Sequence, residues 1–587
     1  MCGIWGEVGI FEGNERSPND LLKIQNLLSI RGNDSSNTLV RKGVQLIHSR
    51  LRLSGDAKHG VQPVETEDGR YFILFNGEIY NLKQLSNAYS IPNKFGDTYL
   101  LERLVVELGA VEAIKCINGM FAISIIDNHR KILHLSVDKY GQKPLFYRIN
   151  NRKVVFGSMS KTVTNGCNSN NIRVSQLARY LEMGFVGPDK SVFKDVERVR
   201  PNSILSIDFR TGEVIHKEVL KFSLPIETNL NIRSVFDELM PDYLNTDFPV
   251  GTTLSGGIDS SLIAYFYTRH YQGDPIAFTV NIKGEGYSEY DQASNFAKRL
   301  GIKLLAVEIN NQDVHNYIDK SVSIMDEPNG DTSIIPTMAL FDFSSKYVKC
   351  LLTGDGGDEL YQGYNRHKAA DLLIQQNMRS YVKRWGIKFG LRNRNLFKFF
   401  LNLFGEAYVG GNLDNRLDKL ERVLSSKNLI EFYRKSLSVD DWQFFETDLT
   451  EYIGMDIQDI DKKLYLPGNN LTRMDVISLA TGVESRAPML DYRSDMASST
   501  IPFNISSDGL KPLLKNLHKQ IYPGSDYTKK GFSFPIAELI NDERYRASIK
   551  LSCELISDTF GKSVNRSSLG SERLFKLAVL GLWMKDL

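Results

Sequence analysis

The sequence LSGGIDSS, residues 254–261, decides the fold of the larger part of this 587-residue chain. It continues the apolar run VGTTLS and leads into the helical segment SSLIAYFYTRH. A strand that passes through two glycines into a helix gathers backbone N–H groups, the Ser260 and Ser261 hydroxyls and the helix N-terminus into a phosphate cradle. Asp259 would repel a phosphate unless a divalent cation lay between them, so the stretch predicts a Mg²⁺–phosphate site. The alternative is a glycine turn that only begins a helix.

Residues 231–587 repeat this strand-to-helix pattern. Four apolar runs are each followed by a helical segment: VGTTLS, IAFTVNI, LLAVEI and KCLLTG. Such alternation predicts a mostly parallel, doubly wound α/β sheet, whose ligands bind beyond the carboxyl ends of the strands. The region contains neither GxxxxGKS nor GxxxxGKT, which excludes a Walker-type phosphate loop.

The run LLTGDGGDELYQGYNRH, residues 351–367, follows the last of these strands with three acids. Asp355, Asp358 and Glu359 repel one another at this spacing, which indicates a cation or a proton-transfer role. A solvated acidic turn is the alternative. The runs at 466–493 and 527–535 supply further charged residues: Arg473, Asp475, Glu484, Arg486, Asp491 and Lys530.

Residues 1–205 have a different pattern, typical of an α+β domain. Many short strands are separated by Gly, Asn and Asp, and helical spacing is clear only near 19–30 and 98–108. The stretch 206–230 changes register and polarity, so we expect it to be the linker between the two domains.

Cys2 is the most reactive candidate in this first domain. Removal of Met1 would leave a cysteine whose own α-amino group can accept the thiol proton, although a small residue after the initiator is usually incidental. Gly3 and Gly6 beside it allow a substrate to approach the backbone. Asn76 and Gly77, which follow the strand YFILF, could form an oxyanion hole, whereas most such Asn-Gly pairs are only turns.

The composition argues against a nucleic-acid-binding, disulfide-rich, secreted or membrane-spanning protein. Lys plus Arg is 72 against 70 for Asp plus Glu, a formal charge of +2, so we expect no nucleic-acid partner. Five scattered cysteines fit neither a disulfide framework nor a zinc site, which favours a reducing cytoplasm. No apolar run reaches the ~18 residues of a membrane span, and the N-terminus lacks the features of a signal peptide.

Seven sequence blocks of the first domain resemble class II glutamine amidotransferases: CGIWG, HSRLRLS, QPV, FNGEIYN, GDTYLL, NGMFAISIID and DKYGQKPLFY. The resemblance implies an N-terminal-nucleophile hydrolase fold, an αββα sandwich in which Cys2 forms a γ-glutamyl thioester. It places Arg50 and Leu51 at the glutamine α-carboxylate, Asn76 and Gly77 at the oxyanion, and Glu78 and Asp97 at the α-amino group. Two departures are RGND at 31–34, where RGPD is usual, and Tyr99, where Glu is usual.

The LSGGIDSS loop resembles that of N-type ATP pyrophosphatases, and residues 231–587 resemble the synthetase domain of glutamine-hydrolysing asparagine synthetases, with added C-terminal helices. The resemblance implies that Asp259 and Asp358 hold Mg²⁺, that Lys530 stabilises charge on the phosphates, and that Asp355 helps to deprotonate ammonia. It places Asp475, Glu484 and Arg486 near the acceptor. The ATP-binding residues it implies are Thr253, Leu254, Ser255, Gly256, Gly257, Asp259, Ser260, Ser261, Val280, Thr353 and Gly354.

The expected reaction uses ATP to convert a carboxylate into an acyl-adenylate, which ammonia from the glutaminase site then attacks after travelling through an enclosed passage. Aspartate, giving β-aspartyl-AMP and L-asparagine, is the favoured acceptor. A sugar uronate for surface polysaccharide is the alternative. A catalytically silent, nucleotide-responsive binding protein is a third reading, opposed by intact Cys2, SGGIDSS and GDGGDE.

A basic stretch at 372–404 has seven Lys or Arg, no acid and several aromatic residues. It favours helices whose aromatic faces pack on the synthetase core, with an anionic membrane or a polysaccharide-assembly partner as alternatives. The partners we expect are otherwise small molecules, and a homodimer is an open alternative to a monomer.

Overall fold

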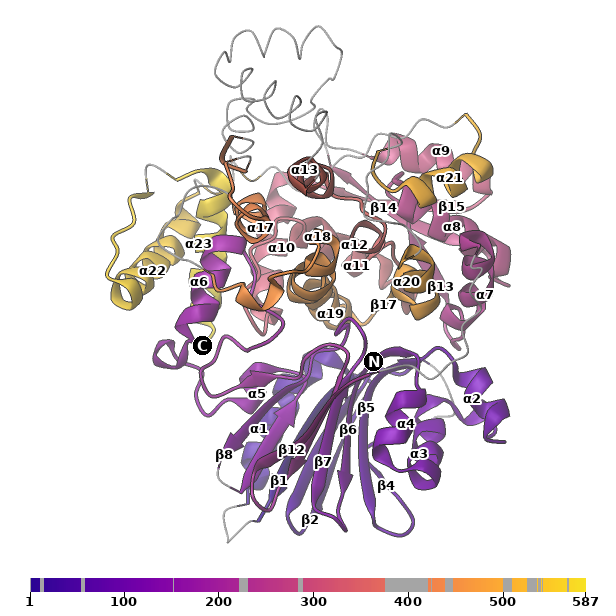
Figure 1. Ribbon diagram of the computed structural model, residues 1–587, viewed down its shortest axis with the longest axis vertical. Coiled ribbons are helices and arrows are strands. Elements are labelled where there is room, and N and C mark those ends of the chain that lie inside the picture. Colours follow the sequence, from indigo (N-terminus) through magenta and orange to yellow (C-terminus); the bar gives the residue numbers. More distant parts are fainter. Residues whose placement is uncertain are drawn as a thin grey trace, which may run out of the picture.

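A computed structural model of the chain (Figure 1) describes most of the sequence. The described residues are 2–10, 15–53, 59–150, 152–220, 231–282, 289–374, 421–423, 425–438, 447–499, 509–524, 536, 540, 542–566 and 569–587. Figure 1 shows two lobes, a lower one dominated by strands and an upper one in which helices surround a sheet.

The lower lobe contains two six-stranded antiparallel sheets. The first has the order β10 (Glu197–Arg198), β8 (Phe146–Asn150), β9 (Lys153–Gly157), β1 (Cys2–Gly9), β3 (Val44–Arg50) and β2 (Ser35–Arg41). The second has the order β12 (Glu213–Val219), β11 (Ser203–Asp208), β7 (Ile132–Val137), β6 (Gly119–Asp127), β5 (Tyr71–Ile79) and β4 (Val64–Glu65).

Alternating side chains of these strands fill three layers of core. Ile4 and Val8 of β1 share one cluster with Leu74 of β5, which lies between the two sheets. On the opposite face of β1, Trp5 packs with helix α1 (Pro18–Leu28). The outer face of β5 packs with α2 (Leu82–Ala88), α3 (Asp97–Leu108) and α4 (Ala110–Cys116). The αββα sandwich predicted from the sequence is therefore confirmed.

The first domain extends beyond the boundary that we expected at residue 205. Ile207 of β11 is buried, β11 pairs with β7, and β12 closes the edge of the second sheet, so residues up to Val219 belong to the sandwich rather than to a linker. The polar, exposed β12 conceals its role as an edge strand in the sequence. Residues 221–230 lie outside the described part of the chain.

The upper lobe is built on a parallel sheet with the order β15 (Lys303–Ile309), β14 (Ile276–Ile282), β13 (Val250–Thr253), β16 (Cys350–Leu352) and β17 (Glu484–Arg486). Successive strands extend the sheet from β13 to β15, and β16 then returns to the other side of β13. This reversal confirms the doubly wound topology and makes the carboxyl ends of β13 and β16 the switch point.

Helices cover both faces of this sheet (Figure 1). One face packs on α7 (Ile232–Tyr243), α8 (Ile258–His270), α9 (Tyr290–Leu300) and α21 (Pro512–Ile521). The other packs on α11 (Ile334–Ser344) and α19 (Leu471–Ala480), and α10 (Asn311–Ile324), α22 (Glu543–Phe560) and α23 (Ser571–Lys585) extend the same core. Besides short 3-10 turns, the described residues also form α5 (Ser160–Val163), α6 (Val174–Met183), α12 (Gly357–Leu360), α13 (Asn365–Ile374), α17 (Leu429–Leu437), α18 (Ile457–Ile460), a π-helical segment (Asp461–Asn470) and α20 (Tyr492–Ser499).

The lobes share one continuous core and several buried hydrogen bonds. The cluster that holds Trp5 of β1 also holds Trp583 of α23. The Tyr180 hydroxyl of α6 donates to the Lys576 carbonyl of α23 at 2.7 Å, and the backbone N–H of Ser160 donates to Asp326 at 2.6 Å. Within the described residues, no helix combines the length and apolarity needed to span a membrane.

Candidate active sites

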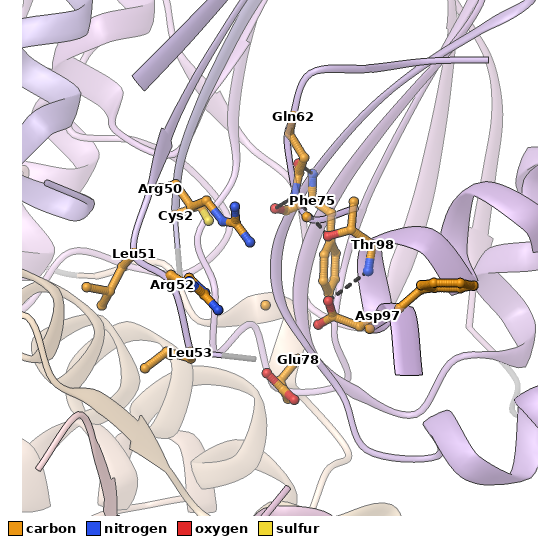
Figure 2. A pocket seen from close by; sticks show the side chains of 14 residues that line it. Cys2, Arg50, Leu51, Arg52, Leu53, Gln62, Phe75, Glu78, Asp97 and Thr98 are labelled. Atoms are coloured by element: carbon orange, nitrogen blue, oxygen red, sulfur yellow. Dashed lines mark hydrogen bonds between the residues drawn. The ribbon is translucent and has the colours of Figure 1, made fainter. Parts of the chain in front are cut away.

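A pocket at the start of β1 contains the candidate nucleophile (Figure 2). Cys2 and Arg50 lie on one side of it, and Glu78, Asp97 and Thr98 face them from the other. Cys2 and Arg50 are direct partners in the β1–β3 register, which explains their proximity. The full lining is Cys2, Arg50, Leu51, Arg52, Leu53, Gly60, Gln62, Phe75, Gly77, Glu78, Phe95, Gly96, Asp97 and Thr98.

The thiol of Cys2 needs a base. Burial raises the pKa of Cys2, although the positive charges of the chain terminus and of Arg50 act in the opposite direction. A buried thiol of raised pKa is a weak nucleophile until a neighbouring group accepts its proton. An α-amino group on Cys2 itself is the base that we expect after removal of Met1.

Asn76 and Gly77 of β5 are placed as the oxyanion-hole hypothesis requires. The backbone N–H of Cys2 donates to Asn76 Oδ1 at 2.8 Å, which orients the amide. Asn76 Nδ2 is buried and has no acceptor among the described residues. At Gly77 an added Cβ would lie 2.0 Å from the Met120 carbonyl oxygen, so only glycine allows this approach of β5 to β6. A buried donor without an acceptor beside a nucleophile is suited to a developing oxyanion.

Two carboxyl groups complete the pocket. Burial raises the pKa of Asp97 to about 6, although the Thr98 backbone N–H donates to it at 2.7 Å. Burial also raises the pKa of Glu78, against the opposing charge of Arg486 from β17. Glu78 therefore touches both lobes, since Arg486 Nη2 lies 3.1 Å from its Oε2.

Gln62 lines this pocket, although the sequence predicted no role for it. Gln62 Nε2 donates to the Phe75 carbonyl at 3.0 Å and Gln62 Oε1 accepts from the Phe75 N–H at 2.6 Å, so Gln62 ties its loop to β5. The QPV block was the available signal. Tyr99, which stands where the resemblance leads us to expect Glu, packs edge-on against two rings. Its ring centroid lies 5.0 Å from that of Phe95 and 5.5 Å from that of His59.

The second candidate site lies at the switch point of the parallel sheet. The LSGGIDSS loop joins β13 to α8, and the loop that contains Asp355 joins β16 to α12. At Gly354 an added Cβ would lie 2.9 Å from Asp259 Cβ, so the two acidic motifs are in contact although 95 residues separate these positions. Thr353 directly follows the last residue of β16. Val280 lies on β14, which neighbours β13 in the sheet.

The loop after β13 has the form of a phosphate cradle. Gly256 has a φ of +80°, and the Ser255 N–H donates to Ser260 Oγ at 3.1 Å, which folds the turn back on the helix. Ser261 differs from the expectation. Its hydroxyl is buried and donates to the Ile258 carbonyl within α8 at 2.9 Å, so it stabilises the helix rather than facing the loop.

Asp259 and Asp358 converge, as the predicted Mg²⁺ site requires. Asp259 Oδ1 is buried and has no hydrogen-bond partner among the described residues. Two carboxylates fit Mg²⁺, which proteins usually hold with one or two carboxylates together with substrate phosphates. Among the described residues, no cluster of three or more potential metal ligands occurs.

The three clustered acids have different environments. Asp355 accepts a hydrogen bond from the Thr353 hydroxyl at 2.7 Å, and burial raises its pKa. Glu359 instead accepts from the Tyr364 hydroxyl at 2.6 Å and from Asn470 Nδ2 at 2.7 Å, and burial raises its pKa to about 7. The negative charges of Asp259 and Asp358 also raise the pKa of Asp355, so these three carboxylates lie near one another. Glu359 belongs to a neighbouring cluster with Tyr364 and Asn470.

The expected acceptor-binding residues lie at the domain interface. Asp475 is buried between Arg31 at 2.7 Å and Lys143 at 3.4 Å, both from the lower lobe. Arg486 lies between Glu484 at 2.6 Å and Glu78 at 3.1 Å. These ion pairs favour a bridging role over acceptor binding. Lys530 and most of the basic stretch at 372–404 lie outside the described residues.

Comparison with known families identifies both domains. The asparagine synthase model matches residues 231–569, and the glutamine amidotransferase domain model matches residues 1–218. The chain is 28% identical to asparagine synthetase [glutamine-hydrolyzing] 1 of Bacillus subtilis, over 91% of this chain and 87% of that protein. It is 25% identical to asparagine synthetase [glutamine-hydrolyzing] 3 of Arabidopsis thaliana, over 86% and 83%. Because the asparagine synthase model matches more than half of the chain and the amidotransferase model matches most of the rest, the chain belongs to the asparagine synthase family.

Proposed function

We propose that this protein makes L-asparagine from aspartate, ATP and glutamine, with β-aspartyl-AMP as the intermediate. The observation that carries the proposal is that one chain contains two sites. In the first, the Cys2 pocket, the amide Nδ2 of Asn76 is buried without a partner among the described residues. In the second, the LSGGIDSS loop with Asp259 packs against the GDGGDE loop with Asp358. The names of the relatives that span most of the chain support aspartate as the acceptor.

In the first half-reaction, Cys2 Sγ attacks the amide carbon of glutamine and its proton passes to the α-amino group exposed by removal of Met1. The Asn76 amide and the Gly77 N–H stabilise the oxyanion. Collapse of this intermediate forms the thioester and releases ammonia, and water then releases glutamate. Arg50 and Leu51 hold the substrate α-carboxylate, and Glu78 and Asp97 hold its α-ammonium group.

In the second half-reaction, a β-carboxylate oxygen of aspartate attacks the α-phosphorus of ATP and pyrophosphate leaves. The LSGGIDSS loop orients the phosphates. Asp259 and Asp358 would hold Mg²⁺, which would neutralise phosphate charge when bound. Ammonia then attacks the acyl carbon and AMP leaves, while Asp355 accepts the proton that the incoming nitrogen loses. A carboxylate of raised pKa is suited to that step.

The shared core supports an enclosed passage for ammonia between the two sites. Glu78 lines the Cys2 pocket and pairs with Arg486 of β17, which is the neighbour of β16 in the sheet. Ammonia that travelled through bulk water would be protonated at neutral pH and would lose its nucleophilicity.

The proposal is tested by ATP-dependent pyrophosphate release with glutamine and a panel of acceptors, chiefly aspartate and several sugar uronates. Turnover specific to aspartate is the expected result. Turnover only with a sugar acid would replace aspartate with a uronate in the same chemistry. If the wild-type chain released neither glutamate from glutamine nor pyrophosphate from ATP with any acceptor, both half-reactions would be contradicted.

A further inference from the structure

One lysine occupies the position between the two predicted metal ligands. Lys511 Nζ contacts Asp259 Oδ2 closely and lies 2.8 Å from Asp358 Oδ1. Only 6% of the Lys511 side chain is exposed. The three residues come from different segments, since Lys511 immediately precedes α21, Asp259 lies in the first turn of α8, and Asp358 lies in the first turn of α12. The ammonium group therefore provides the positive charge that the two carboxylates require.

The surroundings are shaped to fit this triad. At Gly363 an added Cβ would lie 1.9 Å from Asp358 Oδ1 and 2.2 Å from Lys511 Cε. At Gly357 it would lie 2.7 Å from Asp259 Cγ. Glycine at these positions lets the backbone pass directly against the charged groups, so the triad is enclosed rather than formed by flexible surface side chains.

The backbone of Lys511 is also unusual. Its φ of 54° and ψ of 49° lie in the left-handed region, which is disfavoured for a residue with a side chain and disfavoured again before a proline such as Pro512. Gln362, whose carbonyl accepts from the Lys511 N–H at 3.4 Å, has a φ of 60° as well. Strain of this kind persists where the surrounding structure requires one placement of a side chain.

We propose that Lys511 is a positioning residue that stands in for the divalent cation while no nucleotide is bound. It holds Asp259 and Asp358 together, cancels their repulsion, and yields their oxygens when the nucleotide arrives with its cation. The flexible four-carbon stem of lysine allows this movement, and its ammonium can follow the phosphates. The inference rests on the nucleotide site of the proposed function.

This role has a measurable consequence. While Lys511 occupies the site, the enzyme should bind free divalent cation poorly and should take it up only together with ATP. Removal of the lysine takes away the ammonium group that competes with a cation for Asp259 Oδ2 and Asp358 Oδ1, so cation affinity in the absence of ATP should rise. A purely structural lysine would not produce such a gain, because its loss would disturb the site and weaken binding.

The experiment measures Mn²⁺ binding by electron paramagnetic resonance, with and without ATP and with no acceptor or glutamine. The variants are Lys511→Met and Lys511→Gln. Lys143→Met is the matched control, because Lys143 is equally buried and pairs with Asp475 away from the nucleotide loop. We expect both Lys511 variants to bind Mn²⁺ without ATP at least about tenfold more tightly than the wild type, since a competing charge has gone. The control should match the wild type. Asp259→Asn added to Lys511→Met should abolish the gain.

Unchanged or weaker Mn²⁺ binding by folded Lys511 variants would overturn the inference. So would wild-type protein that binds Mn²⁺ alone as tightly as it does with ATP, a result that needs no variant to fold. Wild-type protein that fails to bind Mn²⁺ even with ATP would overturn the proposed nucleotide site, and this inference with it.

Discussion

At the residue scale, the amidotransferase pocket depends on groups that remain unsatisfied until a ligand arrives. The buried Nδ2 of Asn76 has no acceptor among the described residues, and such a group costs about 1–3 kcal/mol when no partner is supplied. Only a glycine fits at position 77, because β6 passes within contact of its Cα. Such a donor is suited to the oxyanion-hole role that we propose for Asn76.

Replacement of the nucleophile should separate the two half-reactions. We expect Cys2→Ala to lower glutamine-dependent asparagine synthesis by roughly a thousandfold or more, because the thioester cannot form. Synthesis from added ammonium salt should persist. Cys553→Ala, in a cysteine of α22 outside the Cys2 pocket, is the matched control and should leave both activities intact. Loss of both activities in Cys2→Ala would contradict two separable sites.

The pH dependence of glutamine binding should report on Asp97. Burial raises the pKa of this carboxyl to about 6, so it is ionised above pH 6 and neutral below. Its attraction for the substrate α-ammonium group is therefore present at neutral pH and lost as the pH falls through about 6. We expect the KM for glutamine to rise below that pH in a glutaminase assay. Asp97→Asn should raise KM at pH 7.5 and remove the inflection near 6.

At the element scale, the arrangement of helices and strands explains where each loop lies. The reversal of strand order at β13 brings the LSGGIDSS and GDGGDE loops together, and this follows from the sequence because parallel strands place their carboxyl ends at one edge. Lys511 could not be found in this way. It lies 252 residues from Asp259, precedes an ordinary amphipathic helix, and has no local signal in the sequence.

The packing of α22 on α23 depends on one glycine. At Gly581 of α23 an added Cβ would lie 1.9 Å from the Ser548 carbonyl oxygen of α22. We expect Gly581→Ala to destabilise the protein by about 1–3 kcal/mol, because the helices must separate even though alanine is the better helix former. The melting temperature measured by circular dichroism should fall. Gly570→Ala, where no described atom lies within 4 Å of the added Cβ, should lower it much less, because this change affects only the N-cap of α23.

At the scale of the whole molecule, the two lobes are joined by buried charges that a linear sequence does not pair. The motifs predicted the folds of both domains. They did not predict that Asp475 would be engaged by Arg31 and Lys143, because this pairing depends on how the lobes dock. The same limit applies to β12, whose exposed polar strand is recognisable only through its partner β11.

The interface ion pairs lead to a prediction about coupling. Asp475→Asn leaves Arg31 and Lys143 without their buried counter-charge, a change that typically costs about 3–5 kcal/mol. We expect the glutaminase rate to persist while the yield of asparagine per glutamate falls, because the passage between the lobes opens to solvent. An unchanged KM for aspartate is part of the prediction. A large rise in that KM with normal coupling would instead return Asp475 to the acceptor site.

The central claim is that one chain transfers the amide nitrogen of glutamine to aspartate at the expense of ATP. The most direct measurement uses glutamine labelled with ¹⁵N in its amide, together with aspartate and ATP, and an excess of unlabelled ammonium in solution. We expect ¹⁵N in the asparagine amide, with one AMP and one pyrophosphate formed per asparagine. Product that carries unlabelled nitrogen, or ¹⁵N transfer accompanied by ADP and phosphate, would contradict it.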